Sequence, residues 1–287
     1  MKSILPILTV VAAIFAIWYA FAVILNAPWA YSKAERADKT LSFSEMVSDT
    51  MAQDKPLLPA PHQVAVEIWK TTALKNVTSK RSLVYHGWIT LQATALGFAF
   101  GIGLGIILAV AIVYSRVMDM SVMPWIIASQ TVPILAIAPM IVVVLAAMQV
   151  DDIVAKGVIS MYLSFFPVVV GMVKGLRSPD TMLLDQMKTY SASPSQAFWK
   201  LRLPASAPYL FASLKVGVAA SLIGAVVAEL SLSQNGGLGA RLLAGSYYGQ
   251  TIQIWSALLA AATLAALMVF AISAIEKVTL RRMGMAQ

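Results

Sequence analysis

The chain has 287 residues, of which 59% are hydrophobic and only 12% charged, and its mean hydropathy is +0.78. Soluble domains carry about 25% charged residues, so this composition indicates an integral membrane protein. The net charge of +8 fits basic residues that flank membrane spans and meet anionic lipid better than it fits nucleic-acid binding. Because the sequence has no cysteine, disulfides, thiolate metal sites and cysteine nucleophiles are excluded. Its histidines, His62 and His86, have no recognised metal-binding spacing.

Six segments are apolar and long enough to cross a hydrocarbon core about 30 Å thick, which takes about 20 residues. They are residues 4–25, 83–114, 120–150, 153–173, 208–228 and 251–275. The second and third exceed one crossing, so tilt or an interfacial turn is expected. We therefore predict an all-α polytopic membrane protein with six transmembrane helices.

Residues 4–25 could be either a retained span or a secretory signal, since Lys2 precedes them and small residues follow near Ala27 and Ala30. An uncharged run of about 22 residues is longer than the 7–15-residue core of a signal peptide. The length favours a retained N-terminal transmembrane helix, residues 1–25.

The short loops set the orientation. Basic residues gather in the 174–207 loop and in the tail after the sixth segment: Lys174, Arg177, Lys188, Lys200, Arg202, Lys277, Arg281 and Arg282. The positive-inside rule places both regions, including the tail 281–287, in the cytoplasm. Counting back through four spans puts the N-terminus there too and residues 26–82 outside. Their eight basic and six acidic residues do not prevent this, because long segments obey the rule weakly.

The external segment 26–82 has predicted structure of its own. Residues 33–54 mix charges with apolar side chains and predict a short surface helix. Residues 57–61 predict an extended break, because each proline biases the preceding residue away from helix. Residues 63–74 predict an interfacial amphipathic helix, with one side formed by Val64, Ile68 and Thr71.

Gly97, Gly101 and Gly105 recur every fourth residue in the second span, with Gly103 alongside. Missing side chains on one helical face let another backbone approach closely, so this pattern predicts helix packing. A phosphate-binding glycine loop would need a preceding strand and a lysine, and neither is present here.

The third span contains Gln130, Thr131, Pro133 and Pro139 within an uncharged run. Each proline frees a carbonyl that lipid cannot satisfy, so a broken helix must be packed in protein or line an aqueous path. A kink that serves packing alone is the alternative. We place Gln130, Thr131 and Pro133 on a translocation path.

Glu229 ends the fifth span, where a carboxylate usually faces a cavity or a cationic partner. It is either a path-facing or outer-gate group, or an interfacial residue in contact with the following loop. Lys215 lies about 21 Å away along the helix, too far to pair, and is expected to extend toward the cytoplasmic boundary. Residues 231–239 are glycine-rich, lead to Arg241, and predict an external loop or re-entrant hairpin that could close a path.

No enzyme constellation is present: there is no HExxH, nucleophile elbow or Walker motif. We predict that the chain is not an enzyme and that it holds no metal and no cofactor. Any ATP and magnesium would be bound by a separate ATPase.

From His86 to Glu276 the chain resembles the membrane subunit of bacterial ABC importers of the nitrate/sulfonate/taurine type. That family also includes transporters of bicarbonate, aromatic compounds and thiamine-pyrimidine precursors. The resemblance rests on the order and spacing of several short stretches: residues 83–105, Gln130…Pro133…Ala136…Pro139, Phe165-Phe166-Pro167, Ser193…Phe198-Trp199…Leu203-Pro204, Ala207-Pro208, Ile223-Gly224-Ala225-Val226…Glu229 and Gly237-Leu238-Gly239.

The family's coupling loop reads Glu-Ala-Ala, three residues, Gly, nine residues, then Ile-x-Leu-Pro. Counted back from Pro204, this sequence keeps the spacing but substitutes most identities, with Asp185, Gln186, Met187, Ser191 and Leu201 at those positions. The family's Trp-Phe-Gly after the third span is also absent. The resemblance implies a short cytoplasmic helix, about 185–200, that contacts the ATPase through Asp185, Lys188, Tyr190, Ser191 and Phe198.

The resemblance implies a type I ABC importer permease fold, with the transport domain at residues 83–280, in the bacterial inner membrane. Two ATPase subunits, a periplasmic or lipid-anchored solute-binding protein and a second permease would be its partners, in addition to membrane lipids. The substituted loop suggests a heterodimer with a different permease, and a homodimer is the simpler alternative. A non-ABC secondary transporter or membrane scaffold is the rival class, but neither inverted repeats nor several intramembrane carboxylates are evident.

Overall fold

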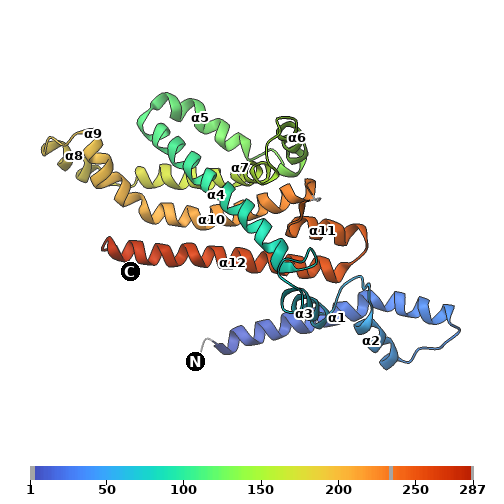
Figure 1. Cartoon of the computed structure of the whole chain (residues 1–287). Helices are drawn as coiled ribbons and strands as arrows, with labels where there is room; N and C mark the ends of the chain where they lie inside the picture. Colours follow the sequence, from blue (N-terminus) through green and yellow to red (C-terminus); the bar gives the residue numbers. More distant parts are fainter. Residues whose placement is uncertain (1–3, 233–234, 286–287) are drawn as a thin grey trace. The chain divides into compact units, whose positions relative to one another are not determined.

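A computed structural model describes residues 4–232 and 235–285. Ser233 and Gln234 of the predicted external loop, and the ends 1–3 and 286–287, lie outside the described residues. Within the described part every regular element is a helix (Figure 1). The chain divides into two compact units, one of Met1–His86 with Ala240–Ala260 and one of Gly87–Gly239 with Ala261–Gln287.

Five continuous stretches of helix are long and apolar enough to cross a membrane. They are α1 (Ile4–Arg36), α4 (Leu83–Tyr114), α7 (Asp152–Leu176), the stretch Pro194–Ser231 that ends with α10, and α12 (Thr251–Arg282). The predicted third span is instead a broken pair, α5 (Arg116–Ser129) and α6 (Ile134–Ala147), bent by 101°. Counting the pair as one span gives the predicted six.

The first helix is longer than predicted, because α1 does not end at residue 25 but continues to Arg36. The prediction of one surface helix over residues 33–54 is therefore wrong. Its first residues belong to the end of α1, and a separate helix, α2 (Phe43–Ala52), follows. Hydropathy marks where apolar side chains stop, whereas the helical backbone continues past Pro28 into a stretch that includes the good helix formers Ala30, Ala34 and Glu35. At 1.5 Å per residue α1 is about 50 Å long and exceeds a hydrocarbon core of about 30 Å.

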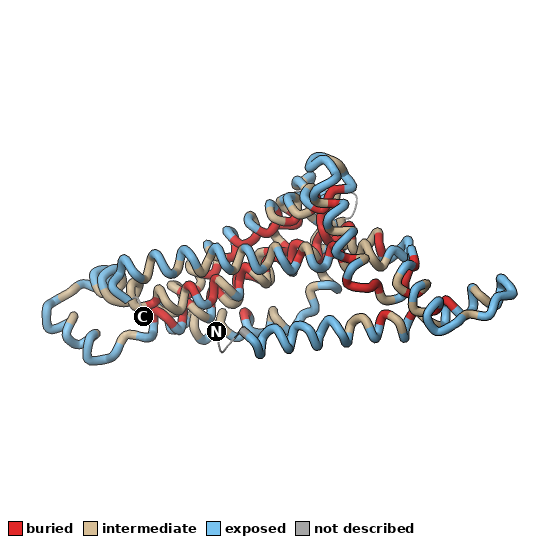
Figure 2. The backbone as a smooth tube through the Cα atoms, turned by 90° about the horizontal axis from the view of Figure 1, so that it is seen from below, coloured by how far each residue is buried: buried red, intermediate tan, exposed pale blue. Residues whose placement is uncertain are grey.

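Asn26, on α1, fastens the extended break that follows α2. Its side chain is 1% exposed, donates to the Leu58 carbonyl at 2.8 Å and accepts from the Leu57 amide at 2.7 Å. The Trp18 indole donates to the Pro59 carbonyl at 3.0 Å. The rest of α1, the helix that starts at N in Figure 2, is mostly exposed.

The predicted helix at 63–74 is confirmed as α3 (Pro61–Thr72), but the side expected to meet the membrane interface is wrong. Val64 and Thr71 are buried inside the unit. The exposed apolar side chains are Val66 and Trp69, on another side of the helix. Helical spacing groups residues on a face, but it does not say which of two apolar faces packs against protein.

The predicted glycine packing face is confirmed in the second unit, where α4 lies directly against α7. A Cβ on Gly97 would be 2.4 Å from the Ser160 Cβ, and one on Gly105 would be 2.7 Å from the Val168 Cβ. Gly103, which points elsewhere, has nothing within 4 Å. Small residues therefore let the helices approach until backbone meets backbone.

Serine hydroxyls join the same helices to α10 (Leu203–Ser231). Ser160 of α7 donates to the Ser221 carbonyl at 2.7 Å, and the Ser221 hydroxyl donates to the Thr94 carbonyl of α4 at 3.0 Å. Both serines are fully buried. These bonds satisfy polar groups that lipid could not, and they hold α4, α7 and α10 as one packed bundle.

Candidate functional site

The 174–207 loop forms a helical hairpin between α7 and α10. It contains α8 (Thr181–Thr189), α9 (Pro194–Ala197) and one turn of π-helix, Phe198–Arg202, that runs directly into α10. The hairpin stands at the end of α7 and α10 in Figure 1. The single helix predicted for about 185–200 is therefore wrong, because the chain turns at residues 190–193.

Ser191 makes that turn with a left-handed backbone, φ +53°. Its amide donates to the Lys188 carbonyl at 2.8 Å, and the Ala192 amide donates to the Met187 carbonyl at 2.9 Å. This pair of bonds is a Schellman motif, whose left-handed residue is usually glycine. Ser191 therefore holds a conformation that glycine would adopt without steric cost.

Local hydrogen bonds define the starts of both short helices. Asp180 caps α8 by accepting from the Met182 amide at 3.0 Å. Ser193 and Gln196 form a reciprocal capping box at the start of α9, with bonds of 3.3 Å and 2.8 Å. Each cap satisfies amides that a helix start leaves without partners.

Phe198 fastens the hairpin to the bundle. Its ring packs edge-on against Tyr114 of α4, with centroids 5.9 Å apart. Four residues on, Arg202 donates to the Leu176 carbonyl at the end of α7, at 2.7 Å. Phe198 therefore supports the hairpin from within, whereas its neighbour Trp199 is 64% exposed.

The other predicted coupling residues lie on the outer surface of the hairpin. Tyr190 is 72% exposed, and Asp185 and Lys188 form an exposed ion pair at 2.9 Å. A pocket of about 280 Å³ opens beside Lys188, between α8, α9 and the end of α4. Trp199, Met182 and Leu183 also expose apolar area here. The sequence analysis missed them as surface residues, although their polar surroundings were a usable signal.

The predicted path residues Gln130, Thr131 and Pro133 form the corner between α5 and α6. Gln130 is half-buried and donates to the Ser129 hydroxyl at 3.2 Å, while Thr131 and Pro133 are exposed. The Tyr162 hydroxyl of α7 donates to the Ser129 carbonyl, which the corner leaves outside the helix pattern. The predicted break in the third span is therefore present, and a hydrogen bond from α7 stabilises it.

Glu229 is fully buried rather than at an open surface. Its carboxylate accepts from the Thr90 hydroxyl of α4 at 2.8 Å and from the Gly239 amide at 2.9 Å. A Cβ on Gly237 (φ +116°) would lie 2.1 Å from the Glu229 carboxyl carbon, so only glycine fits there. Lys156 of α7, also buried, donates to the Gly236 carbonyl at 3.2 Å. Of the two expectations for Glu229, the structure matches contact with the following loop.

Lys215 forms an ion pair with Glu276 of α12 at 2.7 Å. The cationic end that was expected to extend to the cytoplasmic boundary is thus neutralised by a second helix. No hydrogen bond among the described residues joins Glu229 to the corner at Gln130, although Ala138 of α6 packs with Val227 and Ala228, next to Glu229.

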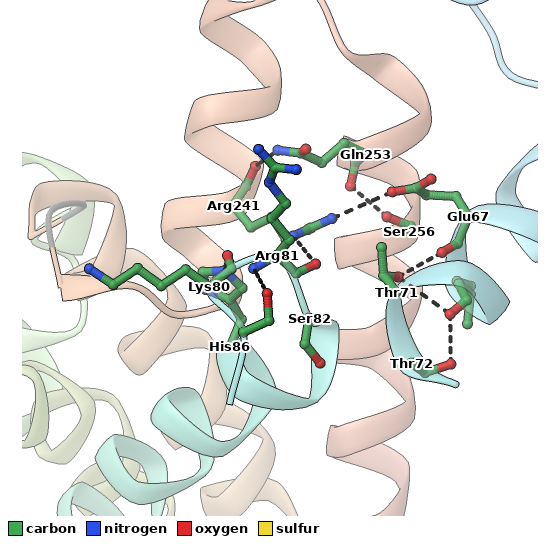
Figure 3. Close-up of polar contacts among 12 residues, drawn as sticks. Glu67, Thr71, Thr72, Lys80, Arg81, Ser82, His86, Arg241, Gln253 and Ser256 are labelled. Atoms are coloured by element: carbon green, nitrogen blue, oxygen red, sulfur yellow. Dashed lines mark hydrogen bonds and ion pairs between the residues drawn. The ribbon is translucent and has the colours of Figure 1, made fainter. Parts of the chain in front are cut away.

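Arg241, on α11 (Leu238–Tyr247), links parts of the first unit (Figure 3). Its guanidinium donates to the Arg81 carbonyl at 2.9 Å and lies 3.5 Å from the Glu67 carboxylate of α3. The Gln253 side chain of α12 donates to the Arg241 carbonyl at 3.2 Å. Burial lowers the pKa of Arg241, and the Glu67 charge partly opposes this. Arg241 thus holds α3 and the start of α4 to α11.

Among residues 4–232 and 235–285 no three histidine, aspartate or glutamate side chains gather where they could hold a metal ion. Five to six apolar helical spans, buried small-residue packing and a braced broken helix define a polytopic membrane protein.

The chain belongs to the family of binding-protein-dependent transport system inner membrane components, whose profile matches residues 101–285. This membership removes the non-ABC alternative. The chain is a permease subunit of an importer-type ABC transporter, and it works with an ATPase and other ABC components.

Individual relatives agree. The chain is 30% identical over 194 residues, 67% of its length, to the formylaminopyrimidine transport permease protein ThiX of Halalkalibacterium halodurans, of which it covers 72%. It is 25% identical to the putative aliphatic sulfonates transport permease protein SsuC of Bacillus subtilis, over 71% of this chain and 70% of that one.

A solved structure shares the fold. A chain of the MetNI methionine ABC transporter, in inward-facing conformations, matches 68% of this chain and 95% of its own length, with a TM-score of 0.57 and 19% identity. At that identity the match shows the fold alone, and it confirms the predicted type I permease architecture.

Proposed function

We propose that the chain imports a small polar or anionic solute that a periplasmic or lipid-anchored binding protein delivers. Relatives named for a formylaminopyrimidine and for aliphatic sulfonates support this solute class. The amide of Gln130 and the hydroxyl of Thr131, at the corner of the broken span, suit such a solute because both can hydrogen-bond it.

The observation that carries the proposal is the hairpin of α8 and α9. It is polar in sequence, yet Met182, Tyr190 and Trp199 are exposed on its surface. Leu184, Met187 and Lys188 line a pocket in the same hairpin. Exposed aromatic groups of this kind are typical of protein interfaces. We assign the hairpin to the ATPase contact, with Asp185, Lys188, Tyr190 and Ser191 at its surface and Phe198 as its internal support.

Two ATPase subunits binding ATP would draw two such hairpins together, and the permease pair would change from inward- to outward-facing. The ATP and magnesium belong to those subunits and not to this chain. Each partner drives the change only as far as it binds one state better than the other. The second permease is either another copy or a different permease that carries a regular glycine in its loop.

We place this subunit in the bacterial inner membrane with both termini cytoplasmic, as the basic residues around the hairpin and after α12 indicate. Residues 83–280 would form the transport domain, and α1 would be a retained span, because Asn26 and Ala30 are buried where it packs. Glu229 would act near the path by holding the Gly237–Gly239 turn rather than by touching solute.

The hairpin assignment is tested with Tyr190→Glu and Trp199→Glu in the complex with its ATPase. Both side chains are exposed, so the permease should still insert and fold, and co-purified ATPase should fall about tenfold or more. Phe43→Glu, an equally exposed aromatic on α2, is the matched control. Equal ATPase recovery with all three variants would contradict the assignment.

A further inference from the structure

Residues 66–81, which run from within α3 to just before the start of α4, form a basic and aromatic surface. The chain has no acidic residue between Glu67 and Asp119. Exposed apolar and basic side chains alternate along this stretch: Val66, Trp69, Lys70, Leu74, Lys75, Val77, Lys80 and Arg81. We name it the basic–aromatic segment.

The exposed apolar area of this segment is large. Trp69 is 65% exposed and Leu74 is 69% exposed. Val66, Trp69 and Ala73 follow helical spacing and share one exposed side, opposite to the buried Val64 and Thr71. A contiguous exposed apolar side of this kind is typical of a surface that contacts a membrane or another protein.

The inner side of the segment is already fastened, and Figure 3 shows how. Arg241 contacts the Glu67 carboxylate and the Arg81 carbonyl, and the His86 ring donates to the Lys80 carbonyl at 2.9 Å. The Lys80 side chain extends away from this cluster in Figure 3. The backbone is therefore held while the basic side chains stay outward.

The position of the segment relative to a bilayer follows from α4. This helix starts at Leu83 and is about 48 Å long at 1.5 Å per residue, against a hydrocarbon core of about 30 Å. If it is centred, each end extends about 9 Å beyond that core, which reaches through the headgroup layer. Arg81 and Lys80, just before Leu83, then lie at the outer edge of the headgroup layer.

We propose that the basic–aromatic segment is a membrane-interface anchor that binds anionic phospholipid headgroups. Trp69 and Leu74 enter the interface, and the basic residues pair with lipid phosphates. Tryptophan with a lysine rim is the usual composition of interfacial helices. Each basic residue near an anionic surface contributes about fivefold to binding. This anchor is independent of the transported solute, and it gives the basic residues outside the bilayer a physical role.

The absence of native cysteine allows a direct test with single spin labels in nanodiscs. A label at Leu74→Cys should be accessible to oxygen, which concentrates in lipid, and shielded from a water-soluble nickel chelate. Ser44→Cys, an exposed polar position on α2, should show the reverse. Equal nickel accessibility at both positions would overturn the proposal.

A second measurement tests the lipid charge. In nanodiscs of phosphatidylcholine with phosphatidylglycerol, the lipid retained on the purified protein should be enriched in phosphatidylglycerol. Enrichment should fall at least fivefold when Lys70, Lys75, Lys80 and Arg81 are all replaced by glutamine, and it should persist when the three lysines become arginine. Unchanged enrichment in the glutamine variant would overturn the proposal. Shielding of the Leu74 label only after a soluble binding protein is added would also overturn it and would identify a protein partner.

Discussion

Replacing Ser191 by glycine should stabilise the coupling hairpin, because this serine adopts a left-handed backbone, φ +53°. That conformation costs an L-residue about 1–2 kcal/mol. Glycine avoids this cost but loses about 0.5–1 kcal/mol of additional chain entropy on folding. The net gain is therefore about 0–1.5 kcal/mol, and its central value of about 0.75 kcal/mol lowers the population of the locally open hairpin about three- to fourfold.

The matched change is Ala192→Gly, at the next residue, where the backbone is not left-handed. It gains nothing from glycine and should destabilise the hairpin by about 0.5–1 kcal/mol. Hydrogen exchange of the amides of α8, followed by mass spectrometry in nanodiscs, measures both. Opposite signs are expected for the two variants. If both change protection in the same direction, the left-handed turn does not control hairpin stability.

Further outcomes follow from packing and charge. Gly97→Ala should lower the free energy of unfolding in mixed detergent micelles by about 1–3 kcal/mol through overpacking, whereas Gly103→Ala, with nothing within 4 Å, should be neutral or stabilising; equal effects would contradict the glycine interface. Glu229→Ala should cost about 1–3 kcal/mol for each buried donor left unsatisfied, seen as a lower melting temperature, and an unchanged melting temperature would count against the network. A hydrogen bond from Lys33 holds the pKa of Asp49 below its usual value, so this contact should be kept above about pH 4 and weaken as pH falls through the lowered pKa. Hydrogen exchange of α2 at pH 3 and pH 6 should show that weakening in the native chain and not in Lys33→Gln.

The membrane spans and the glycine interface were predictable because each depends on local composition. A run of about 20 apolar residues has few alternatives to a span, and Gly97, Gly101 and Gly105 share one side of any helix. The proline-broken third span was predictable for the same reason. Its 101° bend was not, because Tyr162, far away in sequence, braces the corner.

The misjudged features depend on contacts between distant residues. The side of α3 that packs inward is chosen by the surrounding helices, not by the spacing of Val64 and Thr71. The surroundings of Glu229 depend on Thr90, which lies 139 residues earlier. The division of the coupling region into α8 and α9 depends on the left-handed backbone of Ser191. Serine, unlike glycine, has no preference for that conformation, so the residue type did not predict the turn.

The glycine and serine contacts among α4, α7 and α10 determine how this bundle can respond to a push. Flexible side chains between helices can change rotamer and absorb a displacement, whereas backbones already in contact cannot yield. A shift imposed at the start of α10 should therefore travel along its whole length, about 44 Å, and arrive at the Glu229 end as a movement of similar size. Such rigid transmission suits a membrane protein in which an event on one side of the bilayer must change the conformation on the other side.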